Sequence, residues 1–253
     1  MRIDLNGDVG ESFGAYEIGH DAALIPVLTS ANVACGFHAG DPGVMRATVA
    51  LAREHGIAIG AHPGFPDLAG FGRREIKASA REVEDFVAYQ IGALAGIAAA
   101  QSMRVTHVKP HGALYNMAAR DEVLADAIAR ATASVDRSLM LFGLPGSKSL
   151  DAARRHGLRA VSEAFADRAY RADGSLVPRS EPGAVIDDAD AVVERAVSIA
   201  RDRVVVAADG TRVTLDVETI CVHGDTPGAA VLAARIRQAL SDAGIQIRAV
   251  AAV

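Results

Sequence analysis

Ionisable and amide side chains recur in this sequence just after short apolar segments that are rich in valine and isoleucine. They are Asn6, Asp8, Glu11, His38, Asp41, His62, Lys109, His111, Glu163, Asp167, Arg168, His223 and Asp225. Two or three imidazoles with a carboxylate can hold a divalent ion such as zinc, manganese or iron and activate water. Without a metal, a carboxylate or histidine can act as general base while Lys109, Arg168 and backbone N–H groups stabilise an oxyanion. Either scheme hydrolyses a bond such as an amide.

Glycines and further cations accompany these residues. The glycine-rich runs are NGDVGE, CGFHAGDP, GAHPGFPDLAGFGRR, KPHGALY and VHGDTPG. Glycine is expected where the backbone approaches a ligand closely, and equally in ordinary tight turns. Lys109, Arg168 and Arg179 suit an anionic substrate, because arginine binds carboxylate or phosphate through paired hydrogen bonds. The Arg73–Arg74 pair suits it too, although simple solvation at the surface explains that pair equally well.

Each candidate also has a purely structural interpretation. A single histidine after a strand is more often a hydrogen-bonding loop residue than a catalyst. Asp41 and Asp225 stand where acids cap helices, and Asp8, flanked by glycines, is typical of a turn. We expect surface positions for His20, His55 and His156. The coincidence of so many candidates at one kind of position favours a functional site over independent structural roles.

Short apolar runs alternate with longer segments of helical period, which is the pattern of a parallel α/β sheet. Seven strands are predicted, at Ile3–Leu5, Ala31–Cys35, Ile57–Gly60, Val105–Lys109, Leu139–Phe142, Ala160–Glu163 and Thr219–Val222. In a closed parallel barrel the carboxyl ends of the strands converge on one face, where barrel enzymes assemble their sites. We therefore predict a single (β/α) barrel domain, similar to a TIM barrel, over residues 1–253.

Start and stop signals mark the helices between these strands. A helix is predicted over residues 41–56, with an aspartate cap, a proline in its first turn and a glycine at its end. Ser79–Glu82 forms a capping box for the next long helix, and Thr226–Pro227 opens the last one. The segment Arg203–Val217, with Asp209–Gly210 in its middle, is predicted to be a β-hairpin inserted into the barrel.

Composition excludes several classes of protein. The chain has 253 residues, 50% hydrophobic and 23% charged, and its net charge of −5 leaves no basic stripe for nucleic acid. No apolar segment reaches the length of a membrane span, and the start, MRIDLNGDVGE, lacks the pattern of a secretory signal. Cys35 and Cys221 lack the spacing of zinc or redox motifs and are predicted to be buried thiols. We expect a cytoplasmic protein that binds neither nucleic acid nor membrane.

Familiar catalytic and nucleotide motifs are missing from the sequence. It contains no HExxH pattern and no GxSxG elbow. Residues 143–149, GLPGSKS, resemble a phosphate loop, but the lysine follows serine where the Walker pattern requires GK after four intervening residues. We interpret this segment as a loop and a helix start, so the sequence offers no standard motif for holding ATP.

Six long motifs stand in order along nearly the whole chain. They are IDLNGDVGESFG, ANVACGFHAGDP, GAHPGFPDLAGFGRR, VKPHGALYN, SEAFADRAY and ICVHGDTP. Together they closely resemble the LamB/YcsF family. The resemblance implies a seven-stranded (β/α) barrel of the type shared with glycoside hydrolases and polysaccharide deacetylases.

The resemblance also implies ATP-dependent ring opening of 5-oxo-L-proline (pyroglutamate) to L-glutamate, performed with partner subunits B and C. We expect the partners to phosphorylate the lactam with ATP and this chain to open the activated ring. Catalysis is assigned to Asp8, Glu11, His38, His62, Lys109, His111 and Glu163, and substrate binding to Asn6, Asp41, Asp167, Arg168, His223 and Asp225. The expected roles are Asp8 or Glu163 as base, Lys109 for the oxyanion or phosphate, His111 as acid to the leaving group, and Arg168 on the substrate carboxylate.

Two other functions stay open. The first is a metal-dependent deacetylase of carbohydrate amides, with Asp8, His38 and His62 as possible ligands of a divalent metal and with activity that needs neither ATP nor partners. The second is a non-catalytic scaffold that completes its partners. A scaffold is disfavoured, because it has no reason to gather so many groups that are costly to desolvate on one face.

Overall fold

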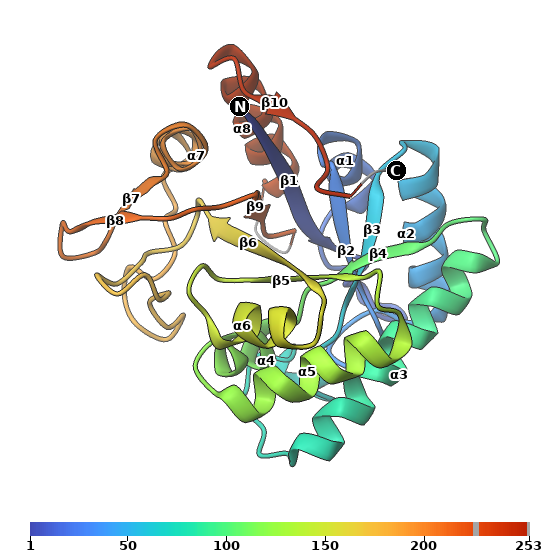
Figure 1. Cartoon of the computed structure of the whole chain (residues 1–253). Coiled ribbons are helices and arrows are strands. Elements are labelled where there is room, and N and C mark those ends of the chain that lie inside the picture. Colours follow the sequence, from blue (N-terminus) through green and yellow to red (C-terminus); the bar gives the residue numbers. More distant parts are fainter. Residues whose placement is uncertain (225–227, 252–253) are drawn as a thin grey trace.

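The computed structural model describes residues 1–224 and 228–251, and its core is a closed parallel β-barrel (Figure 1). The barrel strands are β1 (Arg2–Val9), β2 (Ser30–Ala34), β3 (Ala58–His62), β4 (Val105–Val108), β5 (Met140–Gly143), β6 (Arg159–Phe165) and β9 (Thr219–Val222). Each pairs in parallel with the next, and β9 pairs with both β6 and β1, which closes the barrel. The predicted seven-stranded α/β barrel is therefore confirmed.

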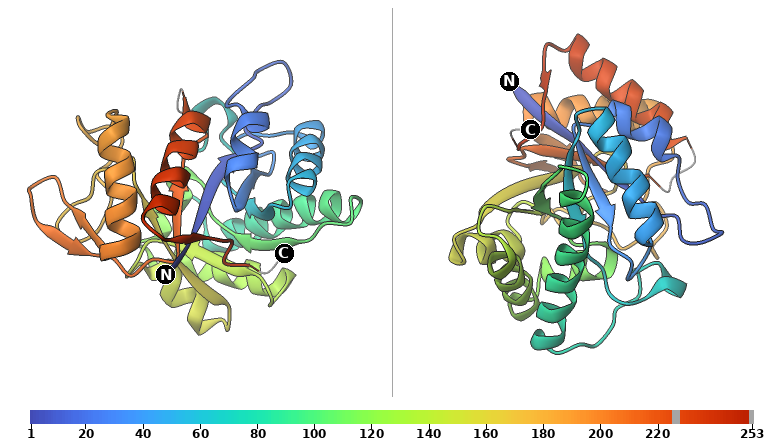
Figure 2. Two further views of the ribbon diagram at one scale, coloured as in Figure 1. Left: turned by 90° about the horizontal axis from the view of Figure 1, so that it is seen from above. Right: turned by 90° about the vertical axis from the view of Figure 1, so that its right-hand side faces the viewer.

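Helices surround the strands, as Figure 2 shows from two further directions. The longer ones are α2 (Pro42–Glu54), α3 (Ala80–Ala99), α5 (Glu122–Val135), α6 (Lys148–Arg155), α7 (Ala189–Asp202) and α8 (Ala229–Asp242). Shorter ones are α1 (Asp21–Leu24), α4 (Gly112–Ala118) and the 3-10 turns η1 (Ile25–Val27) and η2 (Leu68–Gly70). Each long helix buries one apolar stripe against the barrel; in α3 the stripe includes Val83, Val87, Ile91 and Leu94.

Two of the predicted helix starts are present and are capped by the expected side chains. The Asp41 carboxylate accepts hydrogen bonds from the N–H groups of Gly43 and Val44, so it caps α2. The capping box of Ser79 and Glu82 is present at the start of α3. Thr226–Pro227, the predicted opening of the last helix, lies outside the described residues.

The predicted ends of several strands were wrong, and the reason is the polar interior of the barrel. β1 runs through Val9 instead of ending at Leu5, so Asn6 and Asp8 lie inside the strand. Glu163 likewise lies inside β6, and His62 is the last residue of β3. Alternate residues of a strand share one face, and in β1 the face turned to the barrel interior carries polar side chains. An apolar run therefore marks only part of such a strand.

A continuous hydrogen-bonded network fills the middle of the barrel. Asn6 Nδ2 donates to Glu163 Oε1 at 2.9 Å and to Thr219 Oγ1 at 2.7 Å. Asn32 Nδ2 donates to Asn6 Oδ1 at 2.7 Å, and His107 Nε2 donates to Asn32 Oδ1 at 2.8 Å. Burial lowers the pKa of His107 to about 3, so this imidazole is neutral. A satisfied buried network of this kind fixes strand register, because a slip of one residue would leave each group unpaired.

Two features lie outside the barrel. The predicted hairpin is present as the antiparallel pair β7 (Val204–Val206) and β8 (Arg212–Thr214), which projects beside α7 (Figure 1). The short strand β10 (Gln246–Ile247) pairs with the start of β1 and was not predicted. Two residues are too few for periodicity to show, and only the return of α8 to β1 brings them into a ladder.

Replacement of Gly60 by alanine tests the packing inside the barrel. Gly60 faces His107 across the β3–β4 ladder, and a Cβ atom at Gly60 would overlap the His107 imidazole. We expect Gly60→Ala to lower the free energy of unfolding in urea by about 1–3 kcal/mol.

The matched control is Gly92→Ala, at an exposed position inside α3 where a Cβ meets open space. This variant should be unchanged or more stable by up to about 1 kcal/mol, because alanine favours helix. Equal stability of the two variants would contradict the described position of His107.

Candidate active site

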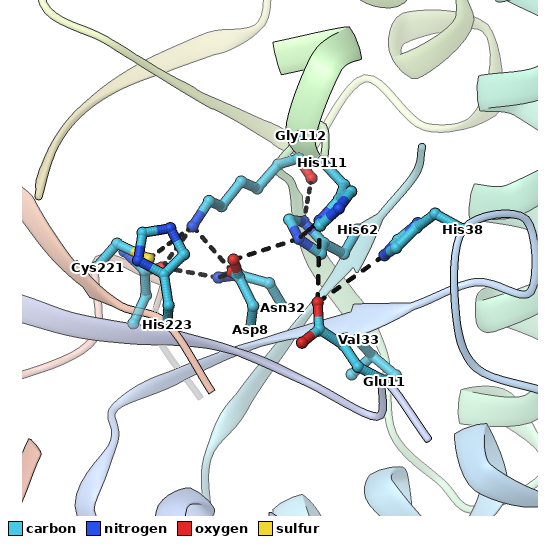
Figure 3. A network of polar contacts seen from close by, with 12 residues as sticks. Asp8, Glu11, Asn32, Val33, His38, His62, His111, Gly112, Cys221 and His223 are labelled. Atoms are coloured by element: carbon cyan, nitrogen blue, oxygen red, sulfur yellow. Dashed lines mark hydrogen bonds and ion pairs between the residues drawn. The ribbon is translucent and has the colours of Figure 1, made fainter. Parts of the chain in front are cut away.

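A cavity of about 660 Å³ opens at the carboxyl ends of the barrel strands. Its wall includes Asp8, His62, Lys109, His111, Arg168 and His223, together with the loops that follow β4, β5 and β6. Six of the thirteen residues singled out in the sequence thus line one cavity, where the fold class places its sites. Figure 3 shows the polar contacts at the base of this cavity.

Lys109 is the most enclosed charge of the site. It directly follows β4, its side chain is 3% exposed, and its Nζ lies 2.9 Å from Asp8 Oδ1 and 3.0 Å from Glu163 Oε1. The same ammonium lies 2.9 Å from Cys221 Sγ. Three strands that are distant in sequence therefore supply the partners of one cation.

The side chains of Lys109 and Asp8 stabilise each other in their charged forms. Burial is the largest single effect on the pKa of Lys109 and acts to lower it, but Asp8, Cys221 and Glu163 together outweigh burial and hold that pKa well above the usual value. For Asp8, burial acts to raise the pKa, and His62 and Lys109 together hold it well below the usual value. Lys109 is consequently an ammonium and Asp8 a carboxylate at neutral pH.

Glu163 and Asp8 differ in their access to the cavity. Glu163 is fully buried, and its Oε1 accepts from Asn6 and Lys109. Asp8 lines the cavity, where its Oδ1 also accepts from Asn32 at 2.8 Å. Asp8 is therefore the carboxylate of the pair that a bound ligand can reach.

Three histidines form the neighbouring wall. The rings of His38 and His111 stack with centroids 3.8 Å apart, and His62 meets His111 edge-on. His62 Nε2 lies 2.9 Å from His111 Nδ1 and 3.4 Å from Asp8 Oδ2. Glu11 Oε1 lies 4.0 Å from His38 Nε2 and 3.9 Å from His111 Nδ1. The structure thus brings together the histidines that follow β2, β3 and β4 and joins them to Asp8.

Burial also controls the charge of these rings. The pKa of His38 lies well below its usual value, first because of burial and then because of the charge of His62. Burial also lowers the pKa of His111 well below its usual value, and the neighbouring rings of His38 and His62 add to this effect. Both imidazoles are neutral at pH 7 and can serve as metal ligands or as hydrogen-bonding groups.

A third group lies on the side of β6 and β9. His223 Nδ1 lies 2.7 Å from Asp167 Oδ2, and the ring of His223 stacks on Phe165. The Arg168 guanidinium donates from Nε to the carbonyl of Ala184 and from Nη2 to the carbonyl of Val177. Burial, with help from nearby Arg179, lowers the pKa of Arg168 to about 10, so it remains a cation. Arg168 therefore both holds the loop after β6 and presents charge to the cavity.

Asp41, which was assigned to substrate binding, lies away from the cavity. Asp41 accepts from the N–H groups of Gly14, Gly43 and Val44 and does not line the cavity. The capping role that its sequence position allowed is the one that the structure shows. Asp225 lies outside the described residues.

Sequence reasoning missed several groups of the site. Asn32, His107 and Thr219 hold the polar interior, but they lie within strands, where no loop motif draws attention to them. Cys221 was predicted only as a buried thiol, yet it contacts Lys109. Tyr115 lines the cavity from α4, and its pKa is raised well above the usual value by burial and then by the charge of Glu163. The period-two pattern Asp4-Asn6-Asp8 could have revealed the polar face of β1.

Arginines surround the mouth of the cavity. Arg73, Arg120, Arg168, Arg171 and Arg179 all belong to its lining, and so do Glu75 and Asp173. The two members of the Arg73–Arg74 pair separate, because Arg74 is bound to Asp67 by an ion pair while Arg73 faces the cavity. The excess of cations makes this mouth attractive to an anionic ligand.

Among the residues that the structure describes, two sets could hold a metal ion. One is Glu11, His38, His62 and His111, and the other is Asp8, Cys221 and His223. The set considered from the sequence, Asp8 with His38 and His62, is divided between them. His38 and His111 lie near Glu11, whereas His62 also lies 3.4 Å from Asp8, which is bound to Lys109.

Fold and site together define a parallel α/β barrel protein with a charged cavity at the carboxyl ends of its strands. The chain belongs to the LamB/YcsF family, whose model matches residues 3–253. The A subunit of 5-oxoprolinase from Tolumonas auensis is 53% identical over 248 residues, covering 98% of this chain and 99% of that protein. The corresponding protein of Bordetella pertussis is 56% identical over 247 residues, covering 98% of each.

Solved structures give the same result. A lactam utilization protein from Thermus thermophilus has a TM-score of 0.93 at 48% identity, covering 98% of this chain and 100% of that one. A family 4 carbohydrate esterase from Streptomyces lividans has a TM-score of 0.53 at 13% identity, covering 99% and 93%. The esterase shares the fold alone. No helix among the described residues is long and apolar enough to cross a membrane.

Removal of the buried ammonium tests the electrostatics of the site. In Lys109→Met, Asp8 and Glu163 lose their shared cation inside the barrel. We expect the free energy of unfolding in urea at pH 7 to fall by about 3–5 kcal/mol, the usual cost of breaking a buried ion pair from one side.

Two further variants complete this test. Lys77→Met, at an exposed lysine, should leave stability unchanged. Adding Glu163→Gln to Lys109→Met should restore part of the loss, because it removes one of the two unpaired carboxylates. A Lys109→Met protein as stable as the wild type would show that the two carboxylates do not depend on this cation.

Proposed function

We propose that this chain is the A subunit of an ATP-dependent 5-oxoprolinase, and that it opens the lactam ring of 5-oxo-L-proline after partner subunits B and C have used ATP to activate it. The observation that carries the proposal is Lys109, held between Asp8 and Glu163 at the base of a cavity rimmed by arginines. The names of relatives that match the chain over nearly their full length support the substrate. The free, buried thiols Cys35 and Cys221 are in keeping with a reducing cytoplasm.

The chemistry explains why ATP is needed. The carbonyl carbon of an unstrained lactam is a poor electrophile, and transfer of a phosphoryl group to the amide oxygen activates it. Water then adds to the carbonyl carbon and loses a proton to a base, and the C–N bond breaks as the nitrogen gains a proton. The product is a phosphorylated carboxyl group, from which a second water molecule releases phosphate to give L-glutamate.

The geometry favours Asp8 over Glu163 as the base. Asp8 lines the cavity, whereas Glu163 is fully buried behind Lys109. The Lys109 ammonium, close to both carboxylates, would stabilise the negative charge that develops on the oxygen or phosphate of the substrate. Preorganised charge of this kind acts without reorganisation of solvent, because the group is already buried.

The expected role of His111 as acid finds no support in its hydrogen bonds. His111 Nε2 donates its proton to the carbonyl of Phe71, which leaves Nδ1 of the neutral ring without a proton. Lys109 and Tyr115 are the cavity groups whose raised pKa values keep them protonated. We therefore assign the proton for the leaving nitrogen to one of these two side chains.

The substrate and its activated form are both anionic, which fits the arginines at the mouth. Arg168 is held in place by two backbone carbonyls, and Arg179 is an exposed member of the cavity lining. We assign the carboxylate of the substrate to these two side chains. The loop Leu144–Ser147 also lines the cavity, but it lacks the Walker pattern, and ATP use is therefore assigned to the partners.

Reconstitution tests the proposed function directly. Purified chain, incubated with 5-oxo-L-proline and ATP, should release no glutamate by itself and should release it, with an equal amount of ADP, when subunits B and C are added. Glutamate release by B and C without this chain would contradict the proposal. Release of acetate from N-acetylated glycans, without ATP or partners, would favour the deacetylase function instead.

The Asp8→Asn variant tests the assigned base within the same assay. Asparagine keeps the shape of the side chain but cannot take a proton, so kcat should fall by about 10²–10⁴-fold. The matched control is Asp121→Asn, at the exposed cap of α5, where asparagine caps equally well and kcat should stay unchanged. Co-elution with B and C and an unchanged circular dichroism spectrum exclude loss of assembly or folding. Full activity of Asp8→Asn would remove Asp8 from the mechanism.

A further inference from the structure

We propose that Glu11, His38, His62 and His111 form a binding site for one divalent transition metal ion, of which zinc is the best match. One ligand atom from each of these buried residues lies within 4.8 Å of the others. The site lies beside the cavity, which His62 and His111 line, and dashed lines in Figure 3 join Glu11 to His38 and His111. The proposal concerns ion binding by this chain alone and does not depend on its substrate.

The hydrogen bonds of two histidines fix their tautomers. His62 Nδ1 lies 2.7 Å from the carbonyl of Lys109, and His111 Nε2 lies 2.8 Å from the carbonyl of Phe71. A carbonyl only accepts, so these two ring nitrogens carry the protons. The ring nitrogens left for a ligand, His62 Nε2 and His111 Nδ1, face each other across 2.9 Å. Either a shared proton or a metal cation can lie between two such nitrogens, and binding of the metal ion releases the proton.

This pattern is the usual support of a metal-binding histidine. Such a residue donates its second N–H to a backbone carbonyl or carboxylate, which orients the ring and fixes the tautomer. Two carbonyls in different loops perform this task here, one after β4 and one after η2. Both histidines are thereby held in the form that binds a metal ion.

His38 supplies an independent observation. Its side chain is completely buried, yet neither Nδ1 nor Nε2 has a hydrogen-bond partner among the described residues. Buried polar atoms are nearly always satisfied, and an exception needs an explanation. A metal ion beside Nε2 provides one. The ring lies parallel to His111, so it must tilt to direct a lone pair at the ion, and no hydrogen bond opposes that tilt.

Donor types and spacing indicate which ion would bind. Three imidazole nitrogens and one carboxylate oxygen suit zinc and similar transition metals, whereas magnesium and calcium prefer oxygen ligands. Bonds of about 2.0–2.1 Å place neighbouring ligand atoms of a tetrahedral zinc site roughly 3.4 Å apart. The separations of 2.9 Å between His62 and His111 and of 3.9 Å between Glu11 and His111 lie on either side of that value.

The second group of potential ligands is a weaker candidate. Lys109 Nζ lies 2.9 Å from both Asp8 Oδ1 and Cys221 Sγ. The ammonium therefore already occupies the space in which a cation would bind these two residues.

A metal ion at the four-residue site would stand next to the assigned base. His62 Nε2 lies 3.4 Å from Asp8 Oδ2, and both His62 and His111 line the cavity.

Metal binding by the purified full-length chain tests the proposal. After removal of metals with a chelator, the protein is titrated with Co²⁺ and the visible absorption of the ion is followed; Zn²⁺ is then added in competition. We expect one Co²⁺ per chain, with the intense bands of a low-coordinate site, and its displacement by one Zn²⁺. Absence of stoichiometric binding by the wild-type chain would overturn the proposal, whatever the result of the glutamate assay.

Four variants locate the site. His38→Ala and Glu11→Gln should each weaken Zn²⁺ binding by at least about 100-fold. Loss of a residue that only hydrogen-bonds to a metal ligand already weakens binding by up to about 100-fold, and loss of a ligand should cost no less. His55→Ala, at an exposed histidine that caps α2, and Cys221→Ser should bind as the wild type does. Since His38 makes no hydrogen bond, its replacement should leave the fold intact, as checked by circular dichroism. Binding that survives both His38→Ala and Glu11→Gln, or that is lost in Cys221→Ser, would refute the proposed ligands.

Discussion

The structure depends above all on one buried cation, the Lys109 ammonium between the carboxylates of Asp8 and Glu163. Each of these charges would be costly to bury alone, and their mutual attraction compensates only if the remaining donors and acceptors are also satisfied. Asn6 and Asn32 satisfy part of this requirement by donating to Glu163 Oε1 and Asp8 Oδ1 from within neighbouring strands. The polar side chains inside the barrel thus help to stabilise the charged residues at the base of the cavity.

The barrel interior explains why this fold can hold such a group in place. Asn6, Asn32 and His107 connect β1, β2 and β4 across the barrel through side-chain hydrogen bonds. Gly60 leaves the space that the His107 ring occupies. The hydrogen-bonded pairing of the seven strands fixes where each of these residues lies along the barrel axis. The side chains that follow them toward the carboxyl ends of the strands therefore reach the cavity at fixed positions. Local rigidity at the base of the cavity follows from hydrogen bonds distributed over the whole barrel.

The cavity brings three kinds of chemistry together. Lys109 and Asp8 lie at its base, His62 and His111 line one wall next to His38 and Glu11, and arginines lie at its mouth. This arrangement suits a reaction in which arginines at the mouth bind an anionic substrate, while groups at the base of the cavity activate water and transfer a proton. It also explains why acidity of the whole chain and attraction of an anion are compatible, because the relevant cations are local.

The sequence by itself predicted the order of strands and helices and the inserted hairpin, since these follow from periodicity, capping residues and turn chemistry that act over short distances, and the family resemblance implied the seven-stranded barrel. It also placed His62, Lys109 and His111 at the ends of strands that meet on one face. Only the tertiary structure decided the partners: Lys109 with Asp8 and Glu163, and His38 and His111 with Glu11. It also showed that Asp41 caps a helix and that β10 exists at all. Such pairings depend on strand register and on the direction of each side chain across the barrel, and neither is encoded in local patterns.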